Sequence, residues 1–89
     1  MVEREVEIVN KLGLHARAAA RLVRLASQFA CDIYLSMDGE RVNAKSILGI
    51  LSLAAAHGSK LSLLCEGSDA QEACDSLAAL IANRFEEAE

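Results

Sequence analysis

Three stretches of the chain alternate between apolar and polar side chains, which is the period-two pattern of a strand that buries one face. They cover residues 2–8, 31–37 and 61–65. Arg4 is the one charged residue on the apolar side of the first stretch. Asp38-Gly39 is typical of a tight hairpin turn and predicts a short fourth strand over residues 41–43, directly after the second.

Between these strands the apolar residues recur at helical spacing. The pattern predicts helices over residues 16–28, from Ser46 to a point before Gly58, and over residues 70–81. Ser68 and Gln71 have the spacing of a capping box at the start of the last helix. The order is strand, helix, strand, strand, helix, strand, helix. It predicts an α/β (α+β) open-faced two-layer sandwich, with a four-stranded antiparallel sheet covered on one face by three helices.

Length and composition limit the kind of function. The chain has 89 residues, of which 53% are hydrophobic. We expect a single domain over residues 1–89 that is too small for a deep cleft and acts on the surface of a partner. The longest nearly apolar run, residues 47–56, is shorter than the ~20 residues of a membrane span. The charged N-terminus is unlike a signal peptide, so we expect a cytoplasmic protein without membrane insertion.

The cysteines and the charge distribution refine this picture. Cys31, Cys65 and Cys74 contain no C-x-x-C pair, which favours reduced, buried thiols over a disulfide or a metal site. Residues 66–89 carry seven acidic residues and a single base, whereas residues 11–24 carry four bases and no acid. This asymmetry predicts a positive end of the molecule around His15.

Gly13, His15 and Arg17 stand where a tight turn meets the first predicted helix. Because none of the usual N-cap residues is present, we expect the N–H groups of the helix start, including those of Ala16 and Arg17, to be available to an anion. A neutral imidazole nitrogen can attack phosphorus, and a guanidinium can bind phosphoryl oxygens. In the alternative interpretation, His15 only caps the helix and Arg17 is a solvated surface residue. An isolated His and Arg would favour that alternative.

The surrounding sequence favours the phosphoryl chemistry. Residues 10–17, Asn-Lys-Leu-Gly-Leu-His-Ala-Arg, followed by Ala19, closely resemble the phosphohistidine signature of the HPr family. These are the histidine-containing phosphocarriers of the bacterial phosphoenolpyruvate-dependent phosphotransferase system. Residues 42–55 resemble the regulatory-serine segment of the same family, and the separation of His15 from Ser46 also fits. The resemblance extends over essentially the whole chain and implies the sandwich fold predicted above.

The resemblance implies a role for each matching residue. His15 would accept a phosphoryl group on Nδ1 from phosphorylated Enzyme I and donate it to IIA domains of sugar permeases, while Arg17 balances the phosphate charge. The family usually has proline where this chain has Ala18. Alanine is also a good helix former, so we expect a slightly more flexible helix start and unchanged chemistry. Sugar-branch and nitrogen-branch carriers share the motif, and both stay open.

Ser46 is an ordinary N-cap residue by itself. In many members of the resembling family, the matching serine is phosphorylated by the HPr kinase/phosphorylase. A phosphate there would add roughly −2 charge beside a surface that meets an acidic partner, so regulation would be electrostatic. We therefore predict Ser46 as a regulatory phosphorylation site.

The predicted helix after Ser46 is too short to bury all of its apolar residues. We expect Ile50 and Leu53 in the core. The partner-binding face is expected to combine an apolar patch with the arginines of the first helix, and the resemblance also places partner contacts there. The residues of this face are Arg17, Arg21, Arg24, Ile47, Leu48 and Leu51.

Other function classes find less support. No P-loop, dinucleotide motif or catalytic triad is present, so we expect no cofactor and no independent enzyme activity. His57 is expected in a solvated loop, without a metal. The bases are too few, and too poor in aromatic neighbours, for nucleic acid. Two alternatives stay open: a regulatory binding module that acts through the Ser46 face, and a small-molecule-binding α/β domain. We expect a monomer.

Overall fold

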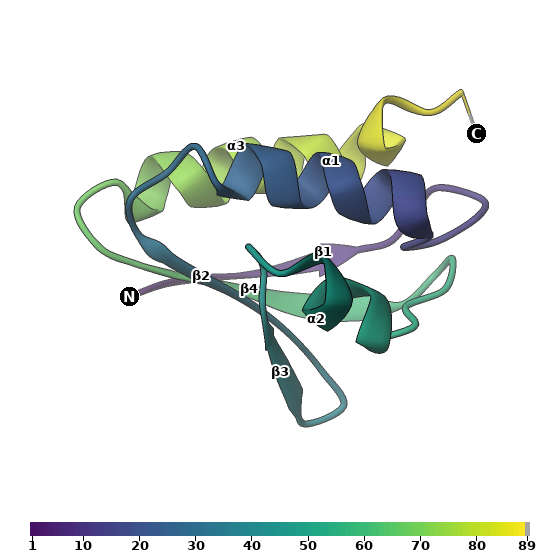
Figure 1. The fold of residues 1–89 in the computed structure, drawn as a ribbon, viewed down its shortest axis with the longest axis horizontal. Helices are drawn as coiled ribbons and strands as arrows, with labels where there is room; N and C mark the ends of the chain where they lie inside the picture. The colour runs from purple at the N-terminus through teal and green to yellow at the C-terminus, as the bar shows by residue number, and fades with distance from the viewer. Residues whose placement is uncertain (89) are drawn as a thin grey trace.

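The predicted order of strands and helices is confirmed in the computed structural model, which describes residues 1–88 (Figure 1). The elements are β1 (Val2–Glu7), α1 (Ala16–Ala26), β2 (Asp32–Met37), β3 (Glu40–Asn43), α2 (Ile47–Ser52), β4 (Lys60–Glu66), α3 (Ala70–Ala82) and a final 3-10 turn, η1 (Arg84–Glu86). The turn η1 was not predicted. In these described residues, no helix is long and apolar enough to cross a membrane.

The strands form one antiparallel sheet in the order β1-β4-β2-β3. Helices α1 and α3 lie side by side over one face, and α2 packs against α1 and β3 (Figure 1). Arg4 lies on the helix side of β1 because its guanidinium pairs with the Asp75 carboxylate of α3. Both side chains are about half exposed, at 40% and 56%, so the pair contributes little to stability.

The β2–β3 hairpin has the turn that its sequence predicts. Asp38 and Gly39 have φ values of 52° and 84°, and the strands pair directly on either side of them. Two consecutive left-handed residues are typical of the type I′ turn, whose twist matches that of the flanking strands. This local agreement fixes the register of β2 against β3.

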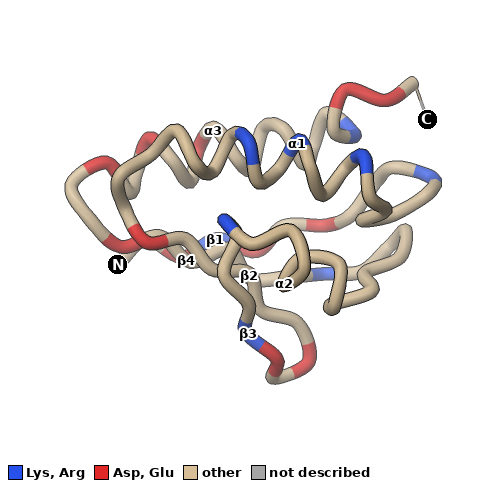
Figure 2. The backbone as a smooth tube through the Cα atoms, in the orientation of Figure 1, with Lys and Arg blue, Asp and Glu red and all other residues tan. Residues whose placement is uncertain are grey.

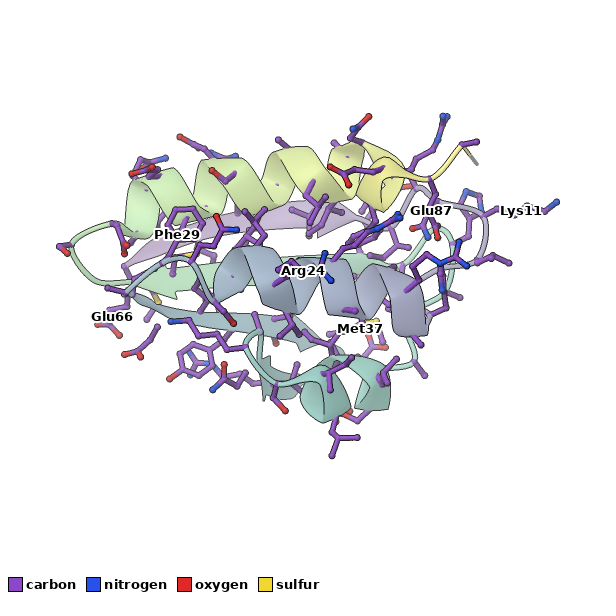
Figure 3. All side chains as sticks on the ribbon, turned by 45° about the horizontal axis from the view of Figure 1, so that its top comes forward. Lys11, Arg24, Phe29, Met37, Glu66 and Glu87 are labelled. Carbon is purple, nitrogen blue, oxygen red and sulfur yellow. The ribbon has the colours of Figure 1, made fainter. Side chains whose placement is uncertain are left out.

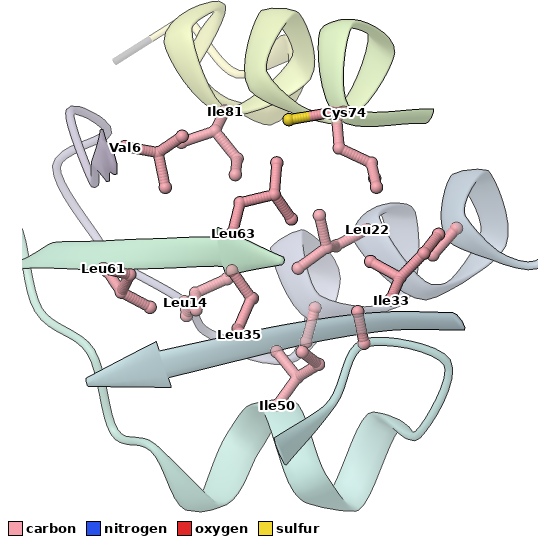
Figure 4. Packing of buried hydrophobic residues seen from close by; sticks show 14 of the residues in the cluster. Val6, Leu14, Leu22, Ile33, Leu35, Ile50, Leu61, Leu63, Cys74 and Ile81 are labelled. Carbon is pink, nitrogen blue, oxygen red and sulfur yellow. The ribbon is translucent and has the colours of Figure 1, made fainter. Parts of the chain in front are cut away.

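The core lies between the sheet and the two long helices (Figure 4). Alanines on α1 let the helix approach the sheet closely, and Ala18, Ala19 and Ala26 are fully buried. The three cysteines are free and buried, as predicted. Burial, with smaller contributions from Cys74 and Cys31, raises the pKa of the Cys65 thiol to about 12. Burial likewise raises the pKa of the Cys31 thiol, so Cys31 and Cys65 are protonated packing residues at neutral pH.

The capping box predicted at the start of α3 is wrong. The N-cap is Asp69, and its side chain makes no capping hydrogen bond. Its carboxylate instead accepts hydrogen bonds from the backbone N–H groups of Ala30 and Cys31, at 2.8 and 2.9 Å. Asp69 thus joins α3 to the segment before β2, and this use of the carboxylate depends on tertiary structure.

Candidate functional site

Gly13 sets the path of the chain into α1. It has a φ of +70°, and a Cβ at this position would lie 2.6 Å from the carbonyl oxygen of Ala55. The next residue, Leu14, is buried and donates its N–H to the same carbonyl at 2.9 Å. Only glycine accepts both this conformation and this close approach. The turn is therefore anchored to the loop after α2, and His15 follows at a fixed place.

His15 is the N-cap of α1. Its backbone is extended, with φ −78° and ψ 179°, and its Nδ1 atom accepts a hydrogen bond of 3.2 Å from the N–H of Arg17. The expectation that every N–H of the helix start is available is therefore wrong for Arg17. The imidazole itself fills the capping role that Ser or Asp usually takes. This places Nδ1 directly at the positive end of the α1 dipole.

The other ring nitrogen of His15 contacts the C-terminal segment. Nε2 lies 2.5 Å from Oε2 of Glu87, and the two side chains are only 25% and 13% exposed. The second oxygen of Glu87, Oε1, accepts a 3.0 Å hydrogen bond from Nδ2 of Asn10. Partial desolvation would raise the pKa of the Glu87 carboxyl, but the hydrogen bonds from Asn10 and His15 outweigh it, and the pKa is lowered. Glu87 is therefore ionised at neutral pH.

An unusual turn after α3 brings Glu87 to His15. Arg84, Phe85 and Glu86 all have positive φ values, between 53° and 66°. Left-handed backbone is unfavourable for such residues, so tertiary contacts have to stabilise it. Phe85 is completely buried, and its carbonyl accepts a 2.5 Å hydrogen bond from the guanidinium of Arg21. The buried ring and the arginine hold the turn against α1.

This turn corrects the prediction of a positive end around His15. Acidic residues of the C-terminal segment fold back over the basic residues of α1 and of the preceding loop (Figure 2). They share an open cleft of about 440 Å³, lined by Lys11, Leu12, Arg17 and Arg21 on one side and by residues 86–88 on the other. Figure 3 shows Lys11 and Glu87 at this same end of the molecule. Both signs of charge therefore meet beside His15.

Ser46 is the N-cap of α2, as predicted, and its Oγ accepts a 3.1 Å hydrogen bond from the N–H of Gly49. The side chain of the neighbouring Lys45 is held in place by a hydrogen bond of 2.8 Å from its Nζ to the carbonyl oxygen of Phe29. Ser46 is partly exposed. Its hydroxyl thus stands at the edge of a short, well-anchored helix.

The apolar residues of α2 and its C-cap divide between core and surface as expected, except that Leu51 is only partly exposed. Ile50 and Leu53 are buried, at 0% and 4% exposure, whereas Ile47 and Leu48 are 40% and 77% exposed. Leu51 is intermediate and packs against the core. We call Ile47, Leu48 and Leu51 the α2 patch.

Two of the three arginines of α1 lie on the side of the helix that faces α3 and η1, and not on the side that faces α2. Arg21 and Arg24 line a groove with Leu80 of α3 and Glu86, whereas Arg17 is exposed at the start of the helix. Arg21 also has a structural role, through its bond to the Phe85 carbonyl. Ala18, in place of the expected proline, is fully buried in the first turn of α1.

His15, Arg17 and Ala16 were predicted from the sequence as one cluster, and the structure brings them together at one helix end. Asn10 and Glu87 were not predicted. A possible signal was Phe85, because a single large apolar side chain in an acidic tail indicates a buried anchor. Across residues 1–88, no group of three or more His, Cys, Asp or Glu side chains could hold a metal ion.

Known proteins are similar to this chain in sequence and in fold. The family described as "PTS HPr component phosphorylation site" matches residues 2–83. Phosphocarrier protein HPr of Cupriavidus necator is 53% identical over the full length of both chains. The HPr-like protein Crh of Halalkalibacterium halodurans is 49% identical and covers 91% of this chain and 96% of its own. The crystal structure of an HPr from Thermoanaerobacter tengcongensis superposes with a TM-score of 0.96, at 46% identity over all of both chains. The chain therefore belongs to the HPr family of phosphocarrier proteins.

Proposed function

We propose that this chain carries a phosphoryl group on Nδ1 of His15, taking it from phosphorylated Enzyme I and passing it to IIA domains of the phosphotransferase system. The single observation that carries the proposal is the position of Nδ1 at the N-terminus of α1, 3.2 Å from the Arg17 N–H. A phosphoryl group on that nitrogen would meet backbone N–H groups and the positive end of the helix dipole.

The residues next to His15 complete the phosphate site. The N–H groups of Ala16 and Arg17 lie in the first turn of α1. The Arg17 N–H, which Nδ1 of His15 caps in the free chain, becomes available to a phosphoryl oxygen once Nδ1 bonds to phosphorus. The exposed guanidinium of Arg17 can donate to phosphoryl oxygens and balance their charge. In each encounter with a partner, the chain accepts or donates one phosphoryl group, and it turns over no substrate alone. We propose that it works as a carrier and needs no cofactor or metal.

We also propose that docking uses the α2 patch together with Arg17, and that Arg21 and Arg24, on the side of α1 toward α3 and η1, contact a partner that reaches across the start of α1. The patch presents apolar surface beside the cationic start of α1, a combination suited to an acidic partner with an apolar contact. Ser46 adjoins this patch as the cap of α2. Phosphorylation of Ser46 by an HPr kinase/phosphorylase would place about two negative charges there and weaken docking.

The experiment uses purified Enzyme I and phosphoenolpyruvate. Wild-type protein is expected to gain one acid-labile phosphate, and His15→Ala none, while His57→Ala keeps full uptake as the matched histidine control. Absence of uptake by the wild type, or equal uptake by His15→Ala, would overturn the proposal. Offering the phosphorylated chain to IIA domains of the sugar and nitrogen branches then identifies its recipient by the faster transfer.

A second candidate function is a regulatory binding module that acts through the Ser46 face. This candidate is supported by the 49% identity to an HPr-like protein Crh, because a solved structure of Crh from Bacillus subtilis is described as that of a catabolite repression protein. Sugar-dependent growth separates the two functions. A carrier depends on His15, so His15→Ala abolishes growth on the transported sugar. A pure regulator instead responds to Ser46→Ala and is indifferent to His15→Ala.

The proposed carrier is a cytoplasmic monomer that occupies residues 1–89 as one domain. A chain of the HPr dimer from Thermoanaerobacter tengcongensis also matches this chain, with a TM-score of 0.79, 47% identity and coverage of 98% of this chain and all of that one. Sedimentation equilibrium at working concentration tests the monomer, which predicts the mass of one 9.5 kDa chain.

A further inference from the structure

We infer that Glu87, oriented by Asn10, is a positioning residue that holds the His15 ring with its proton on Nε2 and its lone pair on Nδ1. The inference rests on the proposed phosphoryl transfer to His15 and adds to it the group that selects the reacting nitrogen. It concerns a contact between the C-terminal segment and α1, more than seventy residues apart in the chain.

Two hydrogen bonds fix the tautomer from opposite sides of the ring. The N–H of Arg17 can only donate, so Nδ1, which lies 3.2 Å away, has to accept through its lone pair. The Glu87 carboxylate can only accept, because its pKa is lowered, so Nε2 at 2.5 Å has to carry the proton. A neutral imidazole has one of each kind of nitrogen, and both contacts demand the same arrangement.

Asn10 holds the carboxylate in place. Its side chain is fully buried, and Nδ2 donates to the Gly13 carbonyl at 2.7 Å and to Oε1 of Glu87 at 3.0 Å. Because a carbonyl oxygen only accepts, the first bond fixes which end of the amide is Nδ2. The second bond then leaves Oε2 as the oxygen that faces His15. Asn10 therefore connects the turn before His15 to the residue behind its ring.

This arrangement suits the transfer step. The Nδ1 lone pair leaves its hydrogen bond with the Arg17 N–H and forms the bond to phosphorus, and the bond from phosphorus to the donor breaks with its electron pair remaining on the donor. The proton stays on Nε2, so the positive charge that develops in the ring faces the Glu87 carboxylate. The phosphoryl group forms on the opposite side of the ring, beside the start of α1. A carboxylate that orients a histidine in this way is a recurring device in catalysis.

The test compares Glu87→Ala with Glu86→Ala. Each variant removes one carboxylate from the same turn, but Glu86 is exposed and makes no hydrogen bond to His15. The ¹⁵N shifts of the His15 ring, measured at alkaline pH where imidazole is neutral, report the tautomer directly. The rate of phosphoryl uptake from phosphorylated Enzyme I reports the consequence.

We expect Glu87→Ala to decrease the fraction with the proton on Nε2 and to slow uptake about 10-fold, as for loss of other orienting partners of histidine. Glu86→Ala should keep the wild-type tautomer fraction, and Glu87→Asp should recover part of the rate. A tautomer fraction in Glu87→Ala equal to that of Glu86→Ala and of the wild type would overturn the inference. If wild-type His15 takes up no phosphate, the carrier function fails instead, and the ¹⁵N shifts still decide whether Glu87 sets the tautomer.

Discussion

At the scale of single residues, Gly13 determines where His15 stands. Its positive φ strains any other residue, and the atom it approaches is the backbone oxygen of Ala55, which cannot rotate away as a side chain would. The turn therefore couples the start of α1 to the loop after α2. A change at Gly13 should act on both the fold and the site.

We predict that Gly13→Ala lowers the free energy of unfolding by about 1–3 kcal/mol from the strained φ alone, and further because of the clash with Ala55. Gly58→Ala is the matched control. Gly58 also has a positive φ, of +90°, but nothing lies within 4 Å of the Cβ that alanine would add. Urea unfolding of both variants measures the difference. An equal loss in the two would mean that the close approach to Ala55 has no energetic consequence.

The residues of the site differ in how far the sequence could predict them. Gly13, His15, Arg17 and Ser46 were predicted because turn and cap positions carry local signatures and because the motif matches a family. Glu87 could not be predicted in this way. Its role depends on three consecutive left-handed residues and a buried Phe85, and acidic tails are usually solvated.

At the scale of elements, local and tertiary effects can be separated. The β2–β3 hairpin follows from Asp38-Gly39 alone, whereas the start of α3 does not follow from Ser68. The Asp69 side chain does not cap α3, because its carboxylate accepts hydrogen bonds from the N–H groups of Ala30 and Cys31 in the segment before β2. Sequence patterns therefore predicted which elements form, but not which side chains connect them.

The caps of α2 and α3 give a paired test. Ser46→Ala removes the acceptor for the Gly49 N–H and should lower the free energy of unfolding by about 1 kcal/mol. Ser68→Ala removes the residue that the capping-box spacing predicts as the cap of α3, and should change the free energy of unfolding by less than about 0.5 kcal/mol. Thermal and urea unfolding check both. A larger loss from Ser68→Ala than from Ser46→Ala contradicts the assignment of caps.

Asp69 gives the fold a predictable pH dependence. Hydrogen bonds from the Ala30 backbone, and then from Cys31, hold the pKa of its carboxyl below the ordinary value. A carboxyl with a lowered folded-state pKa contributes stability above its unfolded pKa and loses it as pH falls through the folded value. Asp69→Asn should therefore destabilise the protein at neutral pH, with the difference shrinking below about pH 4. Urea unfolding across this range measures it, and a difference independent of pH contradicts the assigned role.

At the scale of the whole molecule, the site end brings together three surfaces: the start of α1, the C-terminal segment and the α2 patch. The net charge of −4 does not describe this end, because basic and acidic groups meet there. The patch adds apolar surface that the fold does not use, since Leu48 is 77% exposed. A partner that binds here can therefore gain affinity without disturbing the core.

Leu48→Ala tests this docking role. Because the side chain is largely exposed, the free energy of unfolding should change by less than about 0.5 kcal/mol. Burial of the leucine against Enzyme I predicts a KM for the carrier about 10-fold higher in the variant. Steady-state phosphorylation of Leu48→Ala and wild type measures the ratio. An unchanged KM would exclude Leu48 from the interface.

The central claim is that Nδ1 of His15 is the atom that carries the phosphoryl group. It is tested most directly by a long-range ¹H–¹⁵N spectrum of the uniformly ¹⁵N-labelled chain, recorded after phosphorylation by Enzyme I and phosphoenolpyruvate. We predict that the ¹⁵N resonance of Nδ1 shifts and couples to phosphorus, while Nε2 keeps its proton. Phosphorus on Nε2, or on a residue other than His15, would contradict the account.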